Sequence, residues 1–272
     1  MDTFVLPVRK GGLGNQMFQV AAGLIYAIET KKRVVLPNEF YNSHRTVSSD
    51  YAESIFRECI YRLDKAIDQP AIDALVRSGF SLYPGEPGFD LWTPFDLSGN
   101  VILHGYFQSY PPIQRHEEVI RRTYLSGLGN LRVAFQDSKT RIGLHVRRGD
   151  YLQPPHNTVL PVQPLSYYEE ALRYFSLSHD EVYIFSDDIP WCKEQTLFQQ
   201  IPQKVFVDQP NELKTLALMT TCLGGFICAN STFSWWGAFL GAHAARQPVI
   251  VPKQWVKGQD ASALFPREWI QL

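Results

Sequence analysis

Hydrophobic and polar positions alternate most regularly between about residues 141 and 251. Short apolar runs of strand length alternate there with longer segments whose apolar residues recur at helical spacing. The pattern predicts strands over 141–146, 181–186, 204–207, 225–228 and 248–251, with helices over 166–177, from 190 onward, over 211–222 and up to about 245. Regular strand–helix alternation is typical of an α/β fold with a parallel sheet and helices on both faces.

The first half of the chain shows this pattern at its two ends. Strands are predicted over 4–8, 33–36 (ended by Pro37) and 101–108, and helices over 16–32 and 112–125. Between residues 38 and 100 the pattern indicates helices over about 50–63 and 71–78 and gives no topology. The polar segment 126–139 is the best candidate for a domain boundary.

A cluster of charged side chains follows the predicted strand 141–146. Because strand side chains alternate in direction, His145 and Arg147 are expected on one face, with Arg148 pointing away. Asp150 follows after a glycine turn. Singly, these residues admit simpler interpretations, such as a structural histidine or a weak surface ion pair between Arg148 and Asp150. Together, at the carboxyl end of a strand, they indicate a functional site.

Three other predicted strand ends also carry polar residues. The candidate site residues after the first strand are Gly12, Gly14, Asn15 and Gln16. Those after the strand 181–186 are Asp187 and Asp188. Those after the strand 225–228 are Asn230, Ser231, Thr232, Phe233 and Ser234. Backbone N–H groups at helix starts can bind phosphate, and arginine can bind it in a bidentate manner. The simpler interpretations are a tight turn for the glycines and helix caps for the others. The combination suits a nucleotide diphosphate, and without an Asp-x-Asp triplet no dedicated metal site is expected.

Composition narrows the class of protein. The 272 residues are 45% hydrophobic and 19% charged, which suits a globular protein with a substantial core. A formal net charge of −1 gives no general attraction to nucleic acid or anionic membranes. No signal peptide, spanning segment or zinc spacing is evident, so a cytoplasmic protein with reduced thiols is expected. The cysteines are Cys59, Cys192, Cys222 and Cys228.

Five motifs occur in an order that resembles the bacterial α-1,2-fucosyltransferases of glycosyltransferase family 11, over about residues 8–251. They are GGLGNQMFQ at 11–19, GYFQS at 105–109, HVRRGDY at 145–151, FSDD at 185–188 and NSTFSWWGA at 230–238. The resemblance implies a GT-B type fold of two Rossmann-like domains facing across a cleft. Residues 1–130 would form the acceptor side, and residues 131–272 would bind GDP-L-fucose, with a C-terminal tail packing back.

The resemblance also implies an activity. Fucose would pass from GDP-L-fucose to the 2-hydroxyl of a terminal galactose on an oligosaccharide, with inversion and without an obligatory metal or cofactor. Arg147 resembles the arginine that holds the donor pyrophosphate, and His145 resembles a neighbouring donor-site histidine. Gly14, Asn15 and Gln16 would face the fucose and phosphate, while the motifs at 185–188 and 230–238 would lie on the nucleotide side.

Several alternatives stay open. Asp150 is the candidate general base and His145 its rival, although Asp150 could instead orient Arg148 or the acceptor. A nicotinamide-dependent oxidoreductase should carry G-x-G-x-x-G, which is absent. A non-catalytic sugar- or nucleotide-binding protein and a GDP-sugar transferase of other linkage or acceptor are the other candidates. The proline-rich segment 152–164, expected to be non-helical, would be a substrate lid or a surface excursion. Association with the inner face of a membrane is also compatible with the resemblance.

Overall fold

The structure is a computed structural model that describes residues 3–39, 51, 54–57, 61–66, 69–85, 89, 92–93, 97–133, 140–178 and 180–272. The chain divides into two compact units. One comprises Met1–Leu128 with Ser262–Pro266, and the other Gly129–Ala261 with Arg267–Leu272. Each unit has its own sheet and is described by itself.

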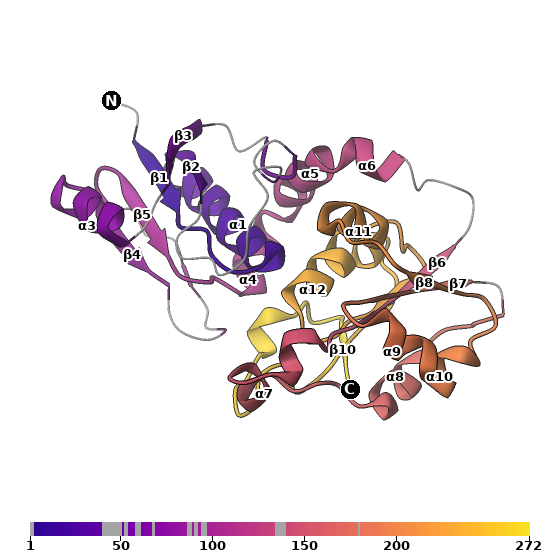
Figure 1. The fold of residues 1–272 in the computed structure, drawn as a ribbon. Coiled ribbons are helices and arrows are strands. Elements are labelled where there is room, and N and C mark those ends of the chain that lie inside the picture. Colours follow the sequence, from indigo (N-terminus) through magenta and orange to yellow (C-terminus); the bar gives the residue numbers. More distant parts are fainter. Residues whose placement is uncertain are drawn as a thin grey trace. The chain divides into compact units, whose positions relative to one another are not determined.

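The first unit is built on a parallel five-stranded sheet with the order β3-β2-β1-β5-β4 (Figure 1). Strand β1 lies between β2 and β5, so the strand order reverses at β1. The carboxyl ends at such a reversal are where open α/β sheets bind ligands. The strands are β1 Phe4–Pro7, β2 Arg33–Glu39, β3 Tyr61–Ala66, β4 Ser81–Pro84 and β5 Val101–His104.

The helices of the first unit are α1 Leu13–Thr30, α3 Gln69–Arg77, α4 Tyr110–Arg115 and α5 Glu117–Gly127. Helix α1 begins earlier than predicted, which places Gly14 and Asn15 in its first turn and not in a preceding loop. The single helix predicted over 112–125 is two helices, separated at His116.

Three predictions for this unit are wrong. The strand predicted over 101–108 ends at His104, because Phe107 has a positive φ and packs against Tyr83 and Trp92. Residues 61–63, assigned to a helix over 50–63, belong to β3, because pairing with Val35 and Leu36 of β2 satisfies their backbone groups. Residue 50 lies outside the described part of the chain. Strand β2 also continues through Pro37 to Glu39, where its pairing with β3 shifts register. An irregularity of this kind accommodates a residue that has no N–H to donate.

The second unit has a parallel six-stranded sheet with the order β11-β10-β9-β6-β7-β8. The predicted alternation of strands and helices is confirmed here. Strand β6 lies between β9 and β7, so this sheet also reverses its order at its first strand. The strands are β6 Arg141–Val146, β7 Glu181–Ser186, β8 Lys204–Val207, β9 Gly225–Ile227, β10 Val249–Val251 and β11 Ile270–Gln271.

The main helices of this unit are α8 Leu165–Leu172, α9 Ile189–Glu194, α11 Glu212–Met219 and α12 Thr232–Ala238, continued by a π-helical turn Phe239–His243. Short helices α6 Gly129–Val133 and α10 Thr196–Gln199 were not predicted. The expectation that 152–164 is non-helical is wrong, since α7 covers His156–Val159. It begins directly after Pro155, and proline is tolerated at a helix start. No helix in the described part of the chain is long and apolar enough to cross a bilayer.

Gly143 of β6 lies in close contact with β9. It pairs with Phe226, and a Cβ atom added at Gly143 would lie 2.2 Å from that ring. We expect Gly143→Ala to destabilise the protein by about 1–3 kcal/mol, because the ring must leave its packed position. The melting temperature should fall by several degrees in a circular-dichroism experiment. Gly129→Ala, where a Cβ meets nothing within 4 Å, is the control, and equal melting temperatures would contradict the packing described.

Three cysteines of this unit, Cys192, Cys222 and Cys228, are free and buried, while Cys59 lies outside the described residues. Burial raises the pKa of the Cys192 thiol to about 11 and the pKa values of the other two further. Since the thiolate is the reactive form, we expect iodoacetamide at pH 8 to leave all three unmodified in the native protein and to label them after denaturation. Peptide mass spectrometry would measure this, and rapid native labelling would be the contrary result.

Candidate functional site

The carboxyl end of β6 is the centre of the candidate site in the second unit. Strand β6 pairs with β7 over its whole length, with Val146 opposite Ser186. The residues that follow the two strands therefore leave the sheet side by side. Arg147 and Arg148 follow β6, and Asp187 and Asp188 follow β7, so the structure brings these predicted site residues together.

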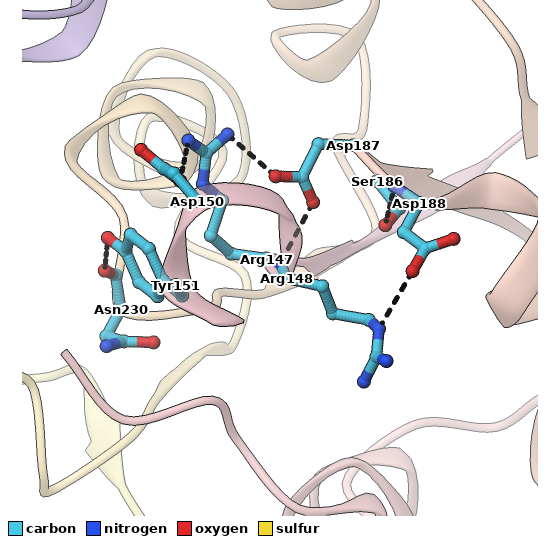
Figure 2. A network of polar contacts seen from close by, with 8 residues as sticks. All are labelled: Arg147, Arg148, Asp150, Tyr151, Ser186, Asp187, Asp188 and Asn230. Atoms are coloured by element: carbon cyan, nitrogen blue, oxygen red, sulfur yellow. Dashed lines mark hydrogen bonds and ion pairs between the residues drawn. The ribbon is translucent and has the colours of Figure 1, made fainter. Parts of the chain in front are cut away.

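The guanidinium group of Arg147 lies between two carboxylates (Figure 2). Its Nη1 is 3.1 Å from Oδ2 of Asp187, and its Nη2 donates a 2.5 Å hydrogen bond to Oδ1 of Asp150. Burial lowers the pKa of Arg147, but the charges of Asp187 and Asp150 outweigh this and leave the pKa above its ordinary value. Arg147 is therefore a charged group held in one orientation.

Arg148 points the other way, as the alternation along the strand predicts (Figure 2). Its Nε donates to Oδ2 of Asp188 at 3.0 Å, and its guanidinium carbon lies 3.8 Å from the centre of the Trp191 ring. Its backbone N–H donates to Oδ1 of Asp187 at 2.9 Å. The ion pair considered between Arg148 and Asp150 is not formed, since Asp150 contacts Arg147 instead.

The two aspartates have structural partners that the sequence reasoning missed. Asp187 contacts both arginines, and Asp188 also caps α9 by accepting a hydrogen bond from the N–H of Trp191 at 3.2 Å. The helix-cap alternative is thus confirmed for Asp188. A signal was present in the sequence, because the acidic pair follows β7 at the same distance as the arginine pair follows β6.

His145 is buried and, unlike the charged groups around it, has a neutral side chain. Its Nδ1 has no hydrogen-bond partner in the part of the chain that the structure describes, and its ring centre lies 6.3 Å from that of Phe233. Burial, and secondarily the charge of Arg147, lowers the pKa of His145 to about 3. The imidazole is therefore neutral at physiological pH and is a weak proton acceptor, which argues against His145 as the general base.

The segment 230–234 lies at the end of β9, the other neighbour of β6. Asn230 is buried, its amide donates to the carbonyl of Trp255 at 3.0 Å, and its own carbonyl accepts from the hydroxyl of Tyr151 at 2.8 Å (Figure 2). The hydroxyl of Ser234 donates to backbone carbonyls, and Ser231 precedes α12 without a side-chain cap. Among the described residues the Oδ1 of Asn230 has no hydrogen-bond partner, so it remains available to a ligand.

The other predicted site residues, Gly12, Gly14, Asn15 and Gln16, belong to the first unit. Gly12 precedes α1, and the other three lie in its first turn. Oδ1 of Asn15 accepts a hydrogen bond from Gln108 at 3.0 Å, and the amide nitrogen of Gln16 donates to the carbonyl of Gly11 at 2.9 Å. Within the described ranges, no group of three or more histidine, cysteine, aspartate or glutamate side chains is arranged to hold a metal ion.

Known structures with a similar fold include the fucosyltransferase NodZ from Bradyrhizobium. Its TM-score is 0.56 at 16% sequence identity, over 89% of this chain and 94% of that one. The predicted α/β class of GT-B type is therefore confirmed.

Similar sequences cover nearly the whole chain. The O-antigen biosynthesis glycosyltransferase WbnK of Escherichia coli is 30% identical over 97% of this chain and 98% of its own. An α-1,2-colitosyltransferase of the same organism is 25% identical over 96% of each chain. The human galactoside α-(1,2)-fucosyltransferase 1 is 28% identical over 97% of this chain and 73% of its own. The family model described as glycosyl transferase family 11 matches residues 8–272, and the chain therefore belongs to this family.

Proposed function

We propose that the protein transfers L-fucose from GDP-L-fucose to the 2-hydroxyl of a terminal galactose, with inversion and without an obligatory metal ion. The observation that carries the proposal is Arg147, a charged guanidinium fixed at the carboxyl end of the strand where the sheet reverses its order. The names of the human relative and of the NodZ structure soaked with GDP-fucose support the donor sugar. The human relative and the colitosyltransferase support the linkage.

In this proposal the acceptor oxygen attacks the anomeric carbon of fucose while the bond from that carbon to the β-phosphate oxygen breaks. Negative charge then develops on the β-phosphate, and Arg147 stabilises it by charge-assisted hydrogen bonds. Arg148 and the polar atoms of Asn230 and His145 would contact the nucleotide. Gly12, Gly14, Asn15 and Gln16 would contribute further substrate contacts.

The proposed general base is Asp150, which would take the proton of the acceptor hydroxyl. It lies in the short turn Gly149–Leu152 and is joined to Arg147, so it would act next to the departing phosphate. Asp150→Asn should lower kcat at neutral pH, because an amide cannot accept the proton of the acceptor hydroxyl. A folded variant with near wild-type kcat would contradict the assignment of Asp150 as the base.

A second candidate differs in the donor sugar, because one of the similar enzymes is a colitosyltransferase. Colitose is L-fucose without the hydroxyl on C3, so both donors present the same leaving group. The test compares kcat/KM for GDP-L-fucose and GDP-L-colitose with the same galactoside acceptor. We expect the higher value for GDP-L-fucose, and a reversed preference would favour the second candidate. Release of GDP from neither donor would favour a non-catalytic binding protein.

A further inference from the structure

The first unit contains polar residues that the proposed reaction has not yet used. Strands β1 and β5 are neighbours, with Pro7 opposite Leu103, and the order of the sheet reverses between them. Lys10 follows β1, and the segment 105–109 follows β5. This segment is one of the five motifs, and no role has been assigned to it.

The segment 105–109 is held in an unusual conformation. Phe107 has a φ of 53°, which is uncommon for a residue other than glycine. Its buried ring lies 6.2 Å from Tyr83 and 5.4 Å from Trp92 between ring centres. Gly105 packs so closely on Gly85 that an added Cβ atom would lie 2.4 Å from the Gly85 Cα. This packing maintains the strained backbone, and such strain is concentrated at functional sites.

Tyr106 is exposed as a result, with 42% of its surface accessible between two buried neighbours. The ammonium group of Lys10 lies 4.6 Å from the centre of its ring. In the described residues this ammonium forms no ion pair, and burial lowers the pKa of Lys10. Burial, and secondarily Lys10, lowers the pKa of His104, so this histidine is neutral at physiological pH. The cluster therefore offers a partly desolvated donor beside an exposed aromatic ring.

Hydrogen-bond acceptors lie at the same strand ends. The amide nitrogen of Gln108 is fixed by its bond to Asn15, which leaves the carbonyl oxygen of Gln108 without a partner among the described residues. The Oε1 of Gln16 and the Oγ of Ser109 belong to fully buried side chains and have no hydrogen-bond partner within the described ranges. An aromatic face with both donors and acceptors beside it suits a ligand that has a hydrocarbon face and several hydroxyl groups.

We infer that the carboxyl ends of β1 and β5 bind the terminal galactose of the acceptor, with its C–H face on Tyr106 and its hydroxyl groups on Lys10 and Gln108. The assignment rests on the proposed function for the identity of the sugar. A phosphate group is a poorer match, since Lys10 is the cation that contacts Tyr106 among the described residues. The neighbouring Arg9 is buried, with its guanidinium carbon 5.6 Å from the centre of the Phe56 ring.

The first test is binding without turnover. Saturation-transfer NMR with methyl β-D-galactoside and N-acetyllactosamine should show contacts for the wild type that are strongest at the C–H protons of one galactose face. Tyr106→Ala should abolish them, and Tyr106→Phe should retain them because the ring remains. Tyr174→Ala, which removes a similarly exposed tyrosine of the second unit, should leave them unchanged. No saturation transfer to the wild type, or equal transfer to Tyr106→Ala, would overturn the inference.

The second test separates this inference from the proposed function. With GDP-L-fucose and lactose, Tyr106→Ala should raise the acceptor KM at least about tenfold while the donor KM changes little. A rise in the donor KM alone would assign the cluster to the donor and overturn the inference. If the wild type neither hydrolyses GDP-L-fucose nor transfers from it, the proposed function fails, whereas the NMR experiment still decides whether the site binds galactose.

Discussion

Arg147→Ala is expected to lower the rate of fucose transfer by about a hundredfold or more, because it removes a fixed donor from the charge that develops on the leaving phosphate. The effect should appear in kcat. Arg147→Lys should recover only part of the loss, since an ammonium group cannot contact Asp150 and Asp187 in the planar geometry that the guanidinium adopts.

Arg173→Ala is the matched control for this experiment. Arg173 also belongs to the second unit, pairs with Glu169 and is largely exposed. Its loss should change neither kcat nor melting temperature, because exposed ion pairs contribute little. Circular dichroism would show whether Arg147→Ala remains folded. A folded Arg147→Ala variant with near wild-type turnover would contradict the role given to Arg147.

Asp187→Ala is expected to have the next largest effect, a loss of about ten- to a hundredfold in kcat. Asp187 touches no reacting atom in the proposed mechanism and acts by positioning. One of its oxygens holds the Arg147 guanidinium, and the other accepts from the backbone N–H of Arg148. Without both contacts the Arg147 side chain can leave its position, and small misplacements of catalytic groups are costly.

A double-mutant cycle distinguishes positioning from independent binding. If Asp187 acts through Arg147, adding Asp187→Ala to Arg147→Ala should cause little further loss of kcat. Additive losses would instead indicate a separate contact of Asp187 with the substrate. Asp208→Ala is the control, because Asp208 is an exposed aspartate that follows β8, the strand next to β7, and it has no ion pair among the described residues.

The sequence predicts the second unit well because the apolar runs of its strands agree with the parallel sheet that they form. Strands β6 and β7 are apolar runs of equal length, and parallel pairing in register brings the residues after them together. The clustering of Arg147 and Asp187 thus follows once the sheet is parallel. Which aspartates each arginine contacts does not follow, since this depends on side-chain directions in the turns after the strands.

The first unit contains features that the sequence pattern does not predict. Tyr61-Arg62-Leu63 has no strong strand pattern, and its structure comes from pairing with β2. The segment after β5 is another case, because the positive φ of Phe107 is maintained by rings that are distant in sequence. Sequence periodicity extends the strand to residue 108, whereas packing ends it at His104 and exposes Tyr106. Both features depend on tertiary contacts and not on local preference.

The most direct test of the central claim is the product of the reaction. The protein would be incubated with GDP-L-fucose and lactose or N-acetyllactosamine in the presence of a chelator, and the product linkage would be determined by NMR. We predict an α-linked fucose on O2 of galactose, which would establish donor, linkage, inversion and metal independence together. Fucose on another position, a β linkage, or no transfer to either galactoside by the folded protein would contradict the account.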